Sequence, residues 1–179
     1  LATDDLQGLR VAIQGVGNVG FHLGRYLKAA GAKLYVTDIH PAHVERAVSA
    51  LGATPVDPGI IHALDVDVFS PCAMGGVLND ATIAEISAPI IAGAANNQLA
   101  TSAHGLQLRE RNILYVPDYV LNAGGIIDIA YQHSGGDKAA MRKHIEGIAA
   151  TLEEIFARAN AENRSTHQVA DELAEERFH

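Results

Sequence analysis

The chain has 179 residues, which is enough for one domain with a core of ordinary size. Hydrophobic residues make up 48% of the sequence and charged residues 19%, which excludes an intrinsically disordered chain. The formal net charge is −8, so no nucleic acid is expected as the main partner, because nucleic-acid binders need a basic surface.

The cysteine, histidine and hydropathy patterns argue against a disulfide-bonded, a metal-binding and a membrane protein. Cys72 is the only cysteine, so a reducing compartment, the cytoplasm, is expected. The nine histidines lack the spacing and neighbours of a metal cage, so no metal is predicted. No apolar stretch reaches the ~20 residues that cross a bilayer, and no membrane partner is expected. Because the first residue is Leu1 rather than Met, we expect a piece of a longer protein.

Short apolar runs alternate with amphipathic segments up to about residue 116. Strands that alternate with helices pair in parallel through right-handed crossovers, which predicts an α/β fold with a Rossmann-type, doubly wound parallel sheet. The predicted strands are 10–14, 34–38, 54–56, 66–70, 89–93 and 113–116. The predicted helices are 18–30, 41–51, 80–86 and 103–111. Within the first helix, apolar residues recur at helical spacing, at Val19, Leu23, Tyr26 and Leu27.

After residue 122 the pattern changes to helices alone. Helices are predicted over 123–133 and 137–161, and Ser165 or Thr166 is expected to cap a last helix that continues at Arg177. We therefore predict a single domain over 1–179. It has a dinucleotide-binding core over 1–134 and a C-terminal helical extension over 137–179.

A glycine motif follows the first predicted strand. Gly15, Val16, Gly17, Asn18, Val19 and Gly20 form G-x-G-x-x-G where a helix begins. The first glycine permits a tight turn, the second lets the backbone approach a pyrophosphate, and the third allows the helix to pack closely. A glycine-rich structural turn is the alternative. The strand before the motif and the helix after it favour dinucleotide binding.

An acidic residue ends the second predicted strand. Asp38 lies 18 residues after Gly20, where a carboxylate accepts hydrogen bonds from the adenosine ribose. It would repel a 2′-phosphate, and no Arg or Lys follows before Arg46. NAD is therefore the predicted cofactor. A solvated strand end is the alternative interpretation of Asp38.

Three later segments end predicted strands at the edge where α/β sheets bind ligands. They cover 70–76, 93–98 and 117–125 and mix small residues with amides, which suits a carboxamide and a ribose. Cys72 has no flanking histidine, so a small buried residue is favoured over a nucleophile. For Asn96 the alternative is ordinary turn chemistry, and for Asn122 it is a helix N-cap.

These segments resemble the glutamate/leucine/phenylalanine/valine dehydrogenases, most of all the leucine branch. The resemblance covers nearly the whole chain and rests on six motifs in order, which are 15–19, 36–39, 70–73, 95–99, 117–120 and 122–125. It implies the C-terminal, NAD-binding domain of an enzyme that oxidatively deaminates a branched-chain or aromatic L-amino acid to its 2-oxo acid and ammonium. A homo-oligomer is implied for the full-length enzyme.

The resemblance also assigns site residues. Asn122 corresponds to an asparagine that holds the amino acid beside the nicotinamide, and Ile126 and Ile129 would line its side-chain pocket. Core packing is the alternative for the two isoleucines. The expected cofactor contacts are Gly15, Val16, Gly17, Asn18, Val19, Gly20, Asp38, Ile39, Cys72, Ala73, Ala95, Asn96 and Asn122.

The catalytic residues of that family have no counterpart here. Its two lysines and its acid–base aspartate belong to an N-terminal domain, where a desolvated lysine activates water. Lys28, Lys33, Lys138 and Lys143 fall on predicted helices or at a strand start, where solvated positions are expected. The chain alone is therefore predicted to bind NAD without turnover. The alternatives are a non-catalytic NAD-binding or assembly module, another branch of the family, and a hydroxy-acid dehydrogenase, although 117–125 lacks the His and Arg of that class.

Overall fold

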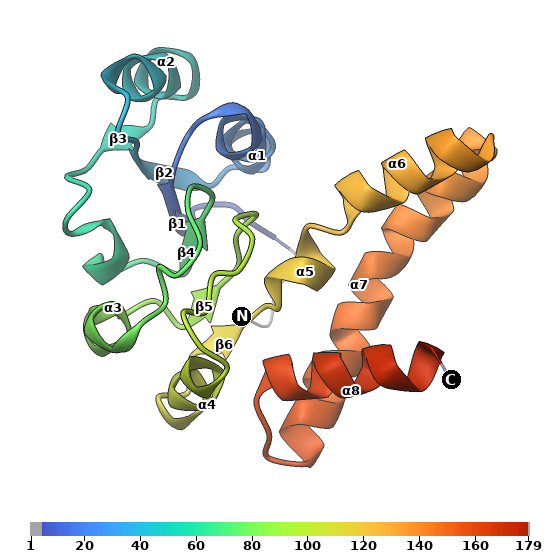
Figure 1. Cartoon of the computed structure of the whole chain (residues 1–179). Helices are drawn as coiled ribbons and strands as arrows, with labels where there is room; N and C mark the ends of the chain where they lie inside the picture. Colours follow the sequence, from blue (N-terminus) through green and yellow to red (C-terminus); the bar gives the residue numbers. More distant parts are fainter. Residues whose placement is uncertain (1–4, 179) are drawn as a thin grey trace.

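The structure, a computed structural model, describes residues 5–178 and confirms the predicted α/β fold (Figure 1). One parallel sheet has the strand order β3-β2-β1-β4-β5-β6, and its direction of winding reverses between β1 and β4. This is the order of a Rossmann-type doubly wound sheet. The strands are β1 (Arg10–Gln14), β2 (Lys33–Thr37), β3 (Thr54–Pro55), β4 (Val68–Pro71), β5 (Ile90–Ile91) and β6 (Leu114–Tyr115).

Helices lie on both faces of the sheet. Because right-handed crossovers run outward in both directions from the centre of the sheet, the helices after β1 and β2 lie opposite those after β4 and β5 (Figure 1). These helices are α1 (Asn18–Ala29) and α2 (Pro41–Leu51) on one face, and α3 (Asp80–Glu85) and α4 (Ala103–Glu110) on the other. A short 3-10 helix, η1 (Ile61–Ala63), precedes β4 and was not predicted.

The core divides into two layers because successive side chains of a strand point to opposite faces. In β1, Val11 and Ile13 pack with the cluster under α1 and α2. Ala12 packs in the other cluster, together with Phe69 of β4. All four side chains are buried, so the centre of the sheet is covered on both faces, as its apolar strands predicted.

The fourth strand begins two residues later than predicted. Asp67 accepts a hydrogen bond from the Arg10 N–H at 2.8 Å through its carboxylate. That side-chain bond uses a donor that would otherwise pair with a backbone carbonyl, so the assigned strand begins at Val68. The fifth strand is also shorter than predicted, although the Ala92 N–H still donates to Phe69 O at 3.0 Å.

The buried face of α1 differs from the apolar spacing in the sequence. Val19 and Tyr26 are 60% and 75% exposed. The helix turns Gly20 and Gly24 into the core instead, with Leu23 and Leu27 half-buried beside them. Residues 20, 23, 24 and 27 share one helical face, and the two glycines let α1 approach the sheet closely.

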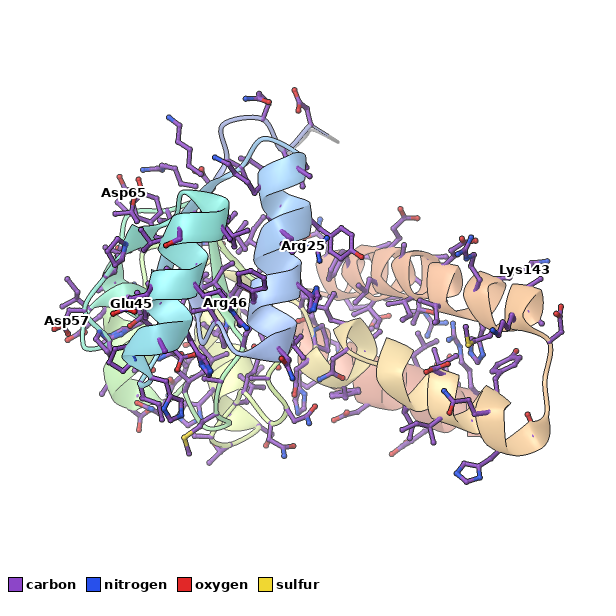
Figure 2. All side chains as sticks on the ribbon, turned by 90° about the horizontal axis from the view of Figure 1, so that it is seen from above. Arg25, Glu45, Arg46, Asp57, Asp65 and Lys143 are labelled. Atoms are coloured by element: carbon purple, nitrogen blue, oxygen red, sulfur yellow. The ribbon has the colours of Figure 1, made fainter. Side chains whose placement is uncertain are left out.

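Helices alone follow β6. They are α5 (Asp118–Leu121), α6 (Gly124–Ser134), α7 (Lys138–Ala161) and α8 (Thr166–Phe178). The hairpin of α6 and α7 extends away from the sheet, and α8 crosses α7 (Figures 1 and 2). Ser165 Oγ accepts the Gln168 N–H at 3.3 Å and caps α8, whereas Thr166 Oγ1 donates to Tyr115 O. α5 was not predicted. Over residues 5–178, no helix is long and apolar enough to cross a bilayer.

Candidate functional site

The loop between β1 and α1 has a shape that requires glycine at its first position. Gly15 has φ +95°, a conformation that L side chains rarely adopt. Its N–H donates to Thr37 O at 2.8 Å, which ties the loop to the end of β2. A Cβ on Gly15 would lie 2.7 Å from the Cβ of Ala73 in the loop after β4. The ends of β1 and β4 therefore meet closely.

The second and third glycines of the loop have different surroundings. A Cβ on Gly20 would lie 1.9 Å from Gly15 O, so α1 packs tightly against its own loop. A Cβ on Gly17 would meet no described atom within 4 Å. Gly17 is also the N-cap of α1, and no described side chain caps the first N–H groups of the helix. The result is bare backbone with free donors, which fits a pyrophosphate.

Asp38 follows β2 and lies beside this loop. Its carboxylate accepts the N–H groups of Val16 and His40, each at 2.9 Å. His43 Nδ1 lies 3.2 Å from Oδ2, within ion-pair distance but without a hydrogen bond to it. Burial raises the pKa of Asp38, but the backbone donors and His43 outweigh it and hold the pKa below its usual value. The carboxylate is thus charged and fixed in direction, and it retains acceptor sites for sugar hydroxyls.

A hollow of about 340 Å³ lies next to Asp38. Ile39 and Met74, which are 81% and 78% exposed, contribute to its lining from the loops after β2 and β4. Ala73 and Gly15 also line it. An apolar hollow beside a carboxylate and a bare loop suits the adenosine part of a dinucleotide. Met74 belongs to the predicted segment 70–76 but was not itself predicted as a site residue. Only the fold shows that it faces the loop that carries Ile39.

Cys72 occupies the switch point of the sheet. Its N–H donates to Gln14 O at 2.7 Å, which extends the β1–β4 pairing by one bond. Burial raises the pKa of the thiol, partly offset by hydrogen bonds from the Ala94 backbone and the Ser70 side chain. Cys72 is half-buried, and its raised pKa favours the protonated thiol, which is not the form that acts as a nucleophile.

Two asparagines from separate loops meet at the same edge of the sheet. Asn122 Nδ2 donates to Asn96 Oδ1 at 2.6 Å and to Ala94 O at 3.3 Å. Ala95 is buried, so its side chain supports the turn while Asn96 is exposed. The fold therefore brings together amides that are 26 residues apart. Asn122 follows α5 rather than capping α6, whose N-cap is Ala123.

Backbone hydrogen bonds join the loops after β4 and β5. The Gly76 N–H donates to Asn97 O at 2.7 Å, and the Leu78 N–H donates to Gln98 O at 2.9 Å. The Ala100 N–H returns a bond to Leu78 O at 2.9 Å. These bonds continue the parallel pairing beyond the sheet. They restrict the motion of the loops that carry Cys72 and Asn96.

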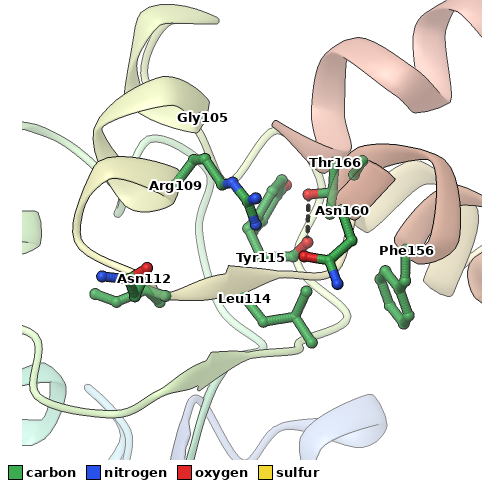
Figure 3. A pocket seen from close by; sticks show the side chains of 10 residues that line it. Gly105, Arg109, Asn112, Leu114, Tyr115, Phe156, Asn160 and Thr166 are labelled. Carbon is green, nitrogen blue, oxygen red and sulfur yellow. Dashed lines mark hydrogen bonds between the residues drawn. The ribbon is translucent and has the colours of Figure 1, made fainter. Parts of the chain in front are cut away.

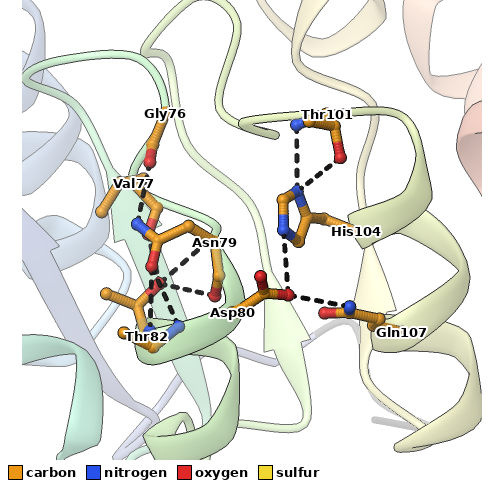
Figure 4. Close-up of polar contacts among 9 residues, drawn as sticks. Gly76, Val77, Asn79, Asp80, Thr82, Thr101, His104 and Gln107 are labelled. Atoms are coloured by element: carbon orange, nitrogen blue, oxygen red, sulfur yellow. Dashed lines mark hydrogen bonds and ion pairs between the residues drawn. The ribbon is translucent and has the colours of Figure 1, made fainter.

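Side-chain hydrogen bonds and an ion pair hold these loops where they lead into α3 and α4 (Figure 4). His104 Nδ1 accepts the Thr101 N–H at 2.9 Å, and its Nε2 lies 3.3 Å from Asp80 Oδ1. Asn79 caps α3 in a reciprocal arrangement with Thr82. The network thus connects the first turns of α3 and α4, directly beyond the loops of the candidate site.

Ile126 and Ile129 lie on α6, one turn apart. They are 66% and 50% exposed, whereas Ile127 between them is buried. The core-packing alternative for the two isoleucines is therefore wrong. Their exposed side chains are free to contact a ligand or a further part of the protein, and the pocket role stays a prediction.

A second hollow lies beside β6, the last strand in the sheet order (Figure 3). Its volume is about 330 Å³, and it lies between α4, β6 and α7, where Arg109 and Asn160 approach from opposite sides. It includes Leu114 at the amino end of β6, away from the glycine loop. None of the predicted site residues lines it, so it is separate from the candidate site.

Asp38→Asn tests whether the charged form of Asp38 supports the loop. The pKa of Asp38 lies below its usual 3.8, so its carboxylate stabilises the fold above that pH, and this contribution is lost as the pH falls through the folded-state pKa. We expect Asp38→Asn to lower the free energy of unfolding by about 1 kcal/mol at pH 7. Urea titrations should show the difference shrinking below about pH 4. An equal difference at pH 7 and pH 3 would contradict this assignment.

The sheet order, the glycine loop and the acid after β2 together define a Rossmann-type domain. Comparison with known proteins then identifies the family. A model of the glutamate/leucine/phenylalanine/valine dehydrogenases matches residues 36–177, and the chain belongs to this family.

Relatives within the family include several amino-acid dehydrogenases. The chain is 48% identical to leucine dehydrogenase of Geobacillus stearothermophilus over 98% of its own length and 48% of that protein. The structure of L-tryptophan dehydrogenase from Nostoc punctiforme matches with a TM-score of 0.94 and 44% identity, over 98% of this chain and 53% of that one. The chain therefore spans about half the length of these relatives. A glutamate dehydrogenase from Thermus thermophilus, at 23% identity and a TM-score of 0.74, shares the fold.

Proposed function

We propose that the chain is the C-terminal, NAD-binding domain of an L-amino-acid dehydrogenase that acts on a branched-chain or aromatic amino acid. The observation that carries the proposal is the bare backbone at Gly17 beside the half-buried carboxylate of Asp38. The names of the relatives, which include leucine and tryptophan dehydrogenases, support the reaction class.

Each part of the dinucleotide would have its own contacts. The glycine loop would hold the pyrophosphate, Asp38 the adenosine ribose, and Ile39 with Ala73 the adenosine pocket. Cys72, Ala95 and Asn96 would border the nicotinamide half. Bound NAD would supply the hydride acceptor for the α carbon of the amino acid. These residues would orient the cofactor and would not themselves transfer protons.

The substrate side would be completed outside these 179 residues. Asn122 would hold the amino acid through its amide, and the exposed Ile126 and Ile129 would border its side chain. The chain's four lysines are exposed, on α1, at the start of β2 and on α7, and none forms a hydrogen bond with Asn96 or Asn122 among the described residues. We therefore expect the N-terminal domain of the full-length, homo-oligomeric enzyme to supply the residues that transfer protons.

Nucleotide titration of the isolated chain tests this function directly. NADH is expected to bind at least about tenfold more tightly than NADPH, because the 2′-phosphate would meet the charged Asp38. In Asp38→Asn, the difference between the affinities for NADH and NADPH should become smaller. Calorimetry and NADH fluorescence measure both affinities. If millimolar NADH produced neither heat of binding nor thermal stabilisation, the proposal would be refuted. Leucine oxidation by the isolated chain would refute the part of the proposal that assigns the proton chemistry to residues outside this chain.

A further inference from the structure

Arg46 reaches from α2 to the glycine loop. Its Nη2 donates to Val16 O at 3.0 Å and to Gly17 O at 3.1 Å. The guanidinium carbon lies 4.1 Å from the ring centroid of Phe21, which is on the first turns of α1. Figure 2 shows Arg46 in the space between α2 and α1. This arginine therefore connects the two helices to the loop between β1 and α1.

The contacts of Arg46 fix the direction of two peptide planes. In a trans peptide, the carbonyl oxygen of one residue and the N–H of the next point in opposite directions. Arg46 holds the carbonyls of Val16 and Gly17, so the N–H groups of Gly17 and Asn18 point away from it. Within residues 5–178, neither N–H has a hydrogen-bond acceptor. These are the donors at the loop and the first turn of α1.

The loop is held from its other side as well. The Val16 N–H donates to Asp38 Oδ2, and the Gly15 N–H donates to Thr37 O. Gly17 O also accepts the Phe21 N–H at 3.2 Å, so Arg46 supplies the second bond to that carbonyl. The backbone up to Val16 is thus fixed by β2. Of the next two peptide planes, Val16–Gly17 is held by Arg46, and Gly17–Asn18 is held by both Arg46 and the first turn of α1.

We propose that Arg46 is a positioning residue that aims the N–H groups of Gly17 and Asn18 at the pyrophosphate of the dinucleotide. The inference rests on the proposed function. Arg46 would act through the backbone, because its Nη2 already binds two carbonyls and its guanidinium stacks on Phe21.

The arrangement uses properties that lysine lacks. A guanidinium is planar and stacks on an aromatic ring, while its N–H groups donate in fixed directions. A lysine at this position would keep the charge but would neither stack as a plane nor hold both carbonyls in one geometry. Arg46→Lys therefore separates the geometric role from the charge, and Arg46→Met removes both.

The test measures affinities for NADH, ADP and adenosine, with folding checked by circular dichroism and thermal unfolding. We expect Arg46→Met to weaken ADP and NADH roughly tenfold, the effect of about 1.4 kcal/mol. Adenosine, which lacks phosphate, should bind unchanged. Arg46→Lys should weaken ADP and NADH as well. Arg25→Met is the matched control, because Arg25 is an exposed arginine on α1 whose side chain has a hydrogen-bond partner only in His22 among the described residues.

The outcomes separate this inference from the proposed function. Equal losses for ADP and adenosine would show general damage to the site and would overturn the positioning role. Native-like binding in Arg46→Lys, together with weakened binding in Arg25→Met, would show an effect of charge alone and would also overturn it. If the unaltered chain binds neither NADH nor ADP, the proposed function fails and the role of Arg46 fails with it.

Discussion

Gly15→Ala is expected to destabilise the fold by about 3 kcal/mol or more. Gly15 has φ +95°, and a Cβ there would lie 2.7 Å from the Ala73 Cβ and 3.0 Å from its backbone N. Ala73 directly follows Cys72, whose N–H donates to Gln14 O, so the Ala73 backbone cannot move far without straining that hydrogen bond. A loss of this size is a large fraction of the ~5–15 kcal/mol that stabilises a typical domain.

Gly17→Ala is the matched variant with the opposite expectation. Its φ is −63° and a Cβ would meet no described atom within 4 Å, so stability should change by no more than about 1 kcal/mol. The added methyl group would instead occupy the space of the pyrophosphate. We expect NADH affinity to fall more than about tenfold while adenosine still binds.

Urea unfolding and NADH titration of both variants check this contrast. Gly15→Ala should lower the unfolding midpoint strongly, and Gly17→Ala should leave it almost unchanged. Gly76→Ala is a useful reference for backbone strain alone, since Gly76 has φ +71° but a Cβ there would meet no described neighbour within 4 Å. A Gly17→Ala protein that binds NADH normally would contradict the assignment of the loop.

The parts of the fold that the sequence predicted depend on local signals. A strand, a glycine turn and a helix start within about ten residues of one another near Gly15, and their order alone fixes where Asp38 must lie. The doubly wound parallel sheet follows from the alternation of strands and helices, because right-handed crossovers leave few topologies. The predicted glycine loop, Asp38 and Ile39 are therefore neighbours in the structure.

The features that were missed depend on contacts between distant segments. Arg46 is a polar residue on an amphipathic helix, and its role is visible only because α2 packs beside α1. The exposure of Val19 was equally hidden, since two glycines rather than large side chains form the contact face of α1. The meeting of Asn96 with Asn122 required the spacing of β5 and β6.

Asp118 is another residue whose role depends on contacts between distant segments. It is 6% exposed and lies at the start of α5. Its Oδ2 accepts the Asn97 N–H at 2.5 Å, and its Oδ1 accepts the Tyr115 hydroxyl at 2.7 Å. Its backbone carbonyl accepts the Asn122 N–H at 2.9 Å. One residue therefore supports both asparagine loops of the candidate site.

Asp118→Ala is expected to destabilise the fold by about 3 kcal/mol, because it leaves the buried Tyr115 hydroxyl and the partly buried Asn97 N–H without their acceptor. Asp118→Asn should recover most of this, since an amide can accept the Asn97 N–H and donate to the Tyr115 oxygen. Urea unfolding of both variants measures the difference. An asparagine variant as unstable as the alanine variant would show that the charge, rather than the hydrogen-bond geometry, stabilises this site.

The pH dependence of unfolding provides an independent check on the same contact. Burial, with the hydrogen bond to Asp118 as the next cause, raises the pKa of Tyr115 above its usual 10.0. A group whose folded-state pKa is raised contributes stability that is complete below its unfolded pKa and is lost as the pH rises. The free energy of unfolding should therefore fall above about pH 10. Because Tyr119 is shifted in the same direction by burial and by Asp171, Tyr115→Phe should reduce the fall without removing it.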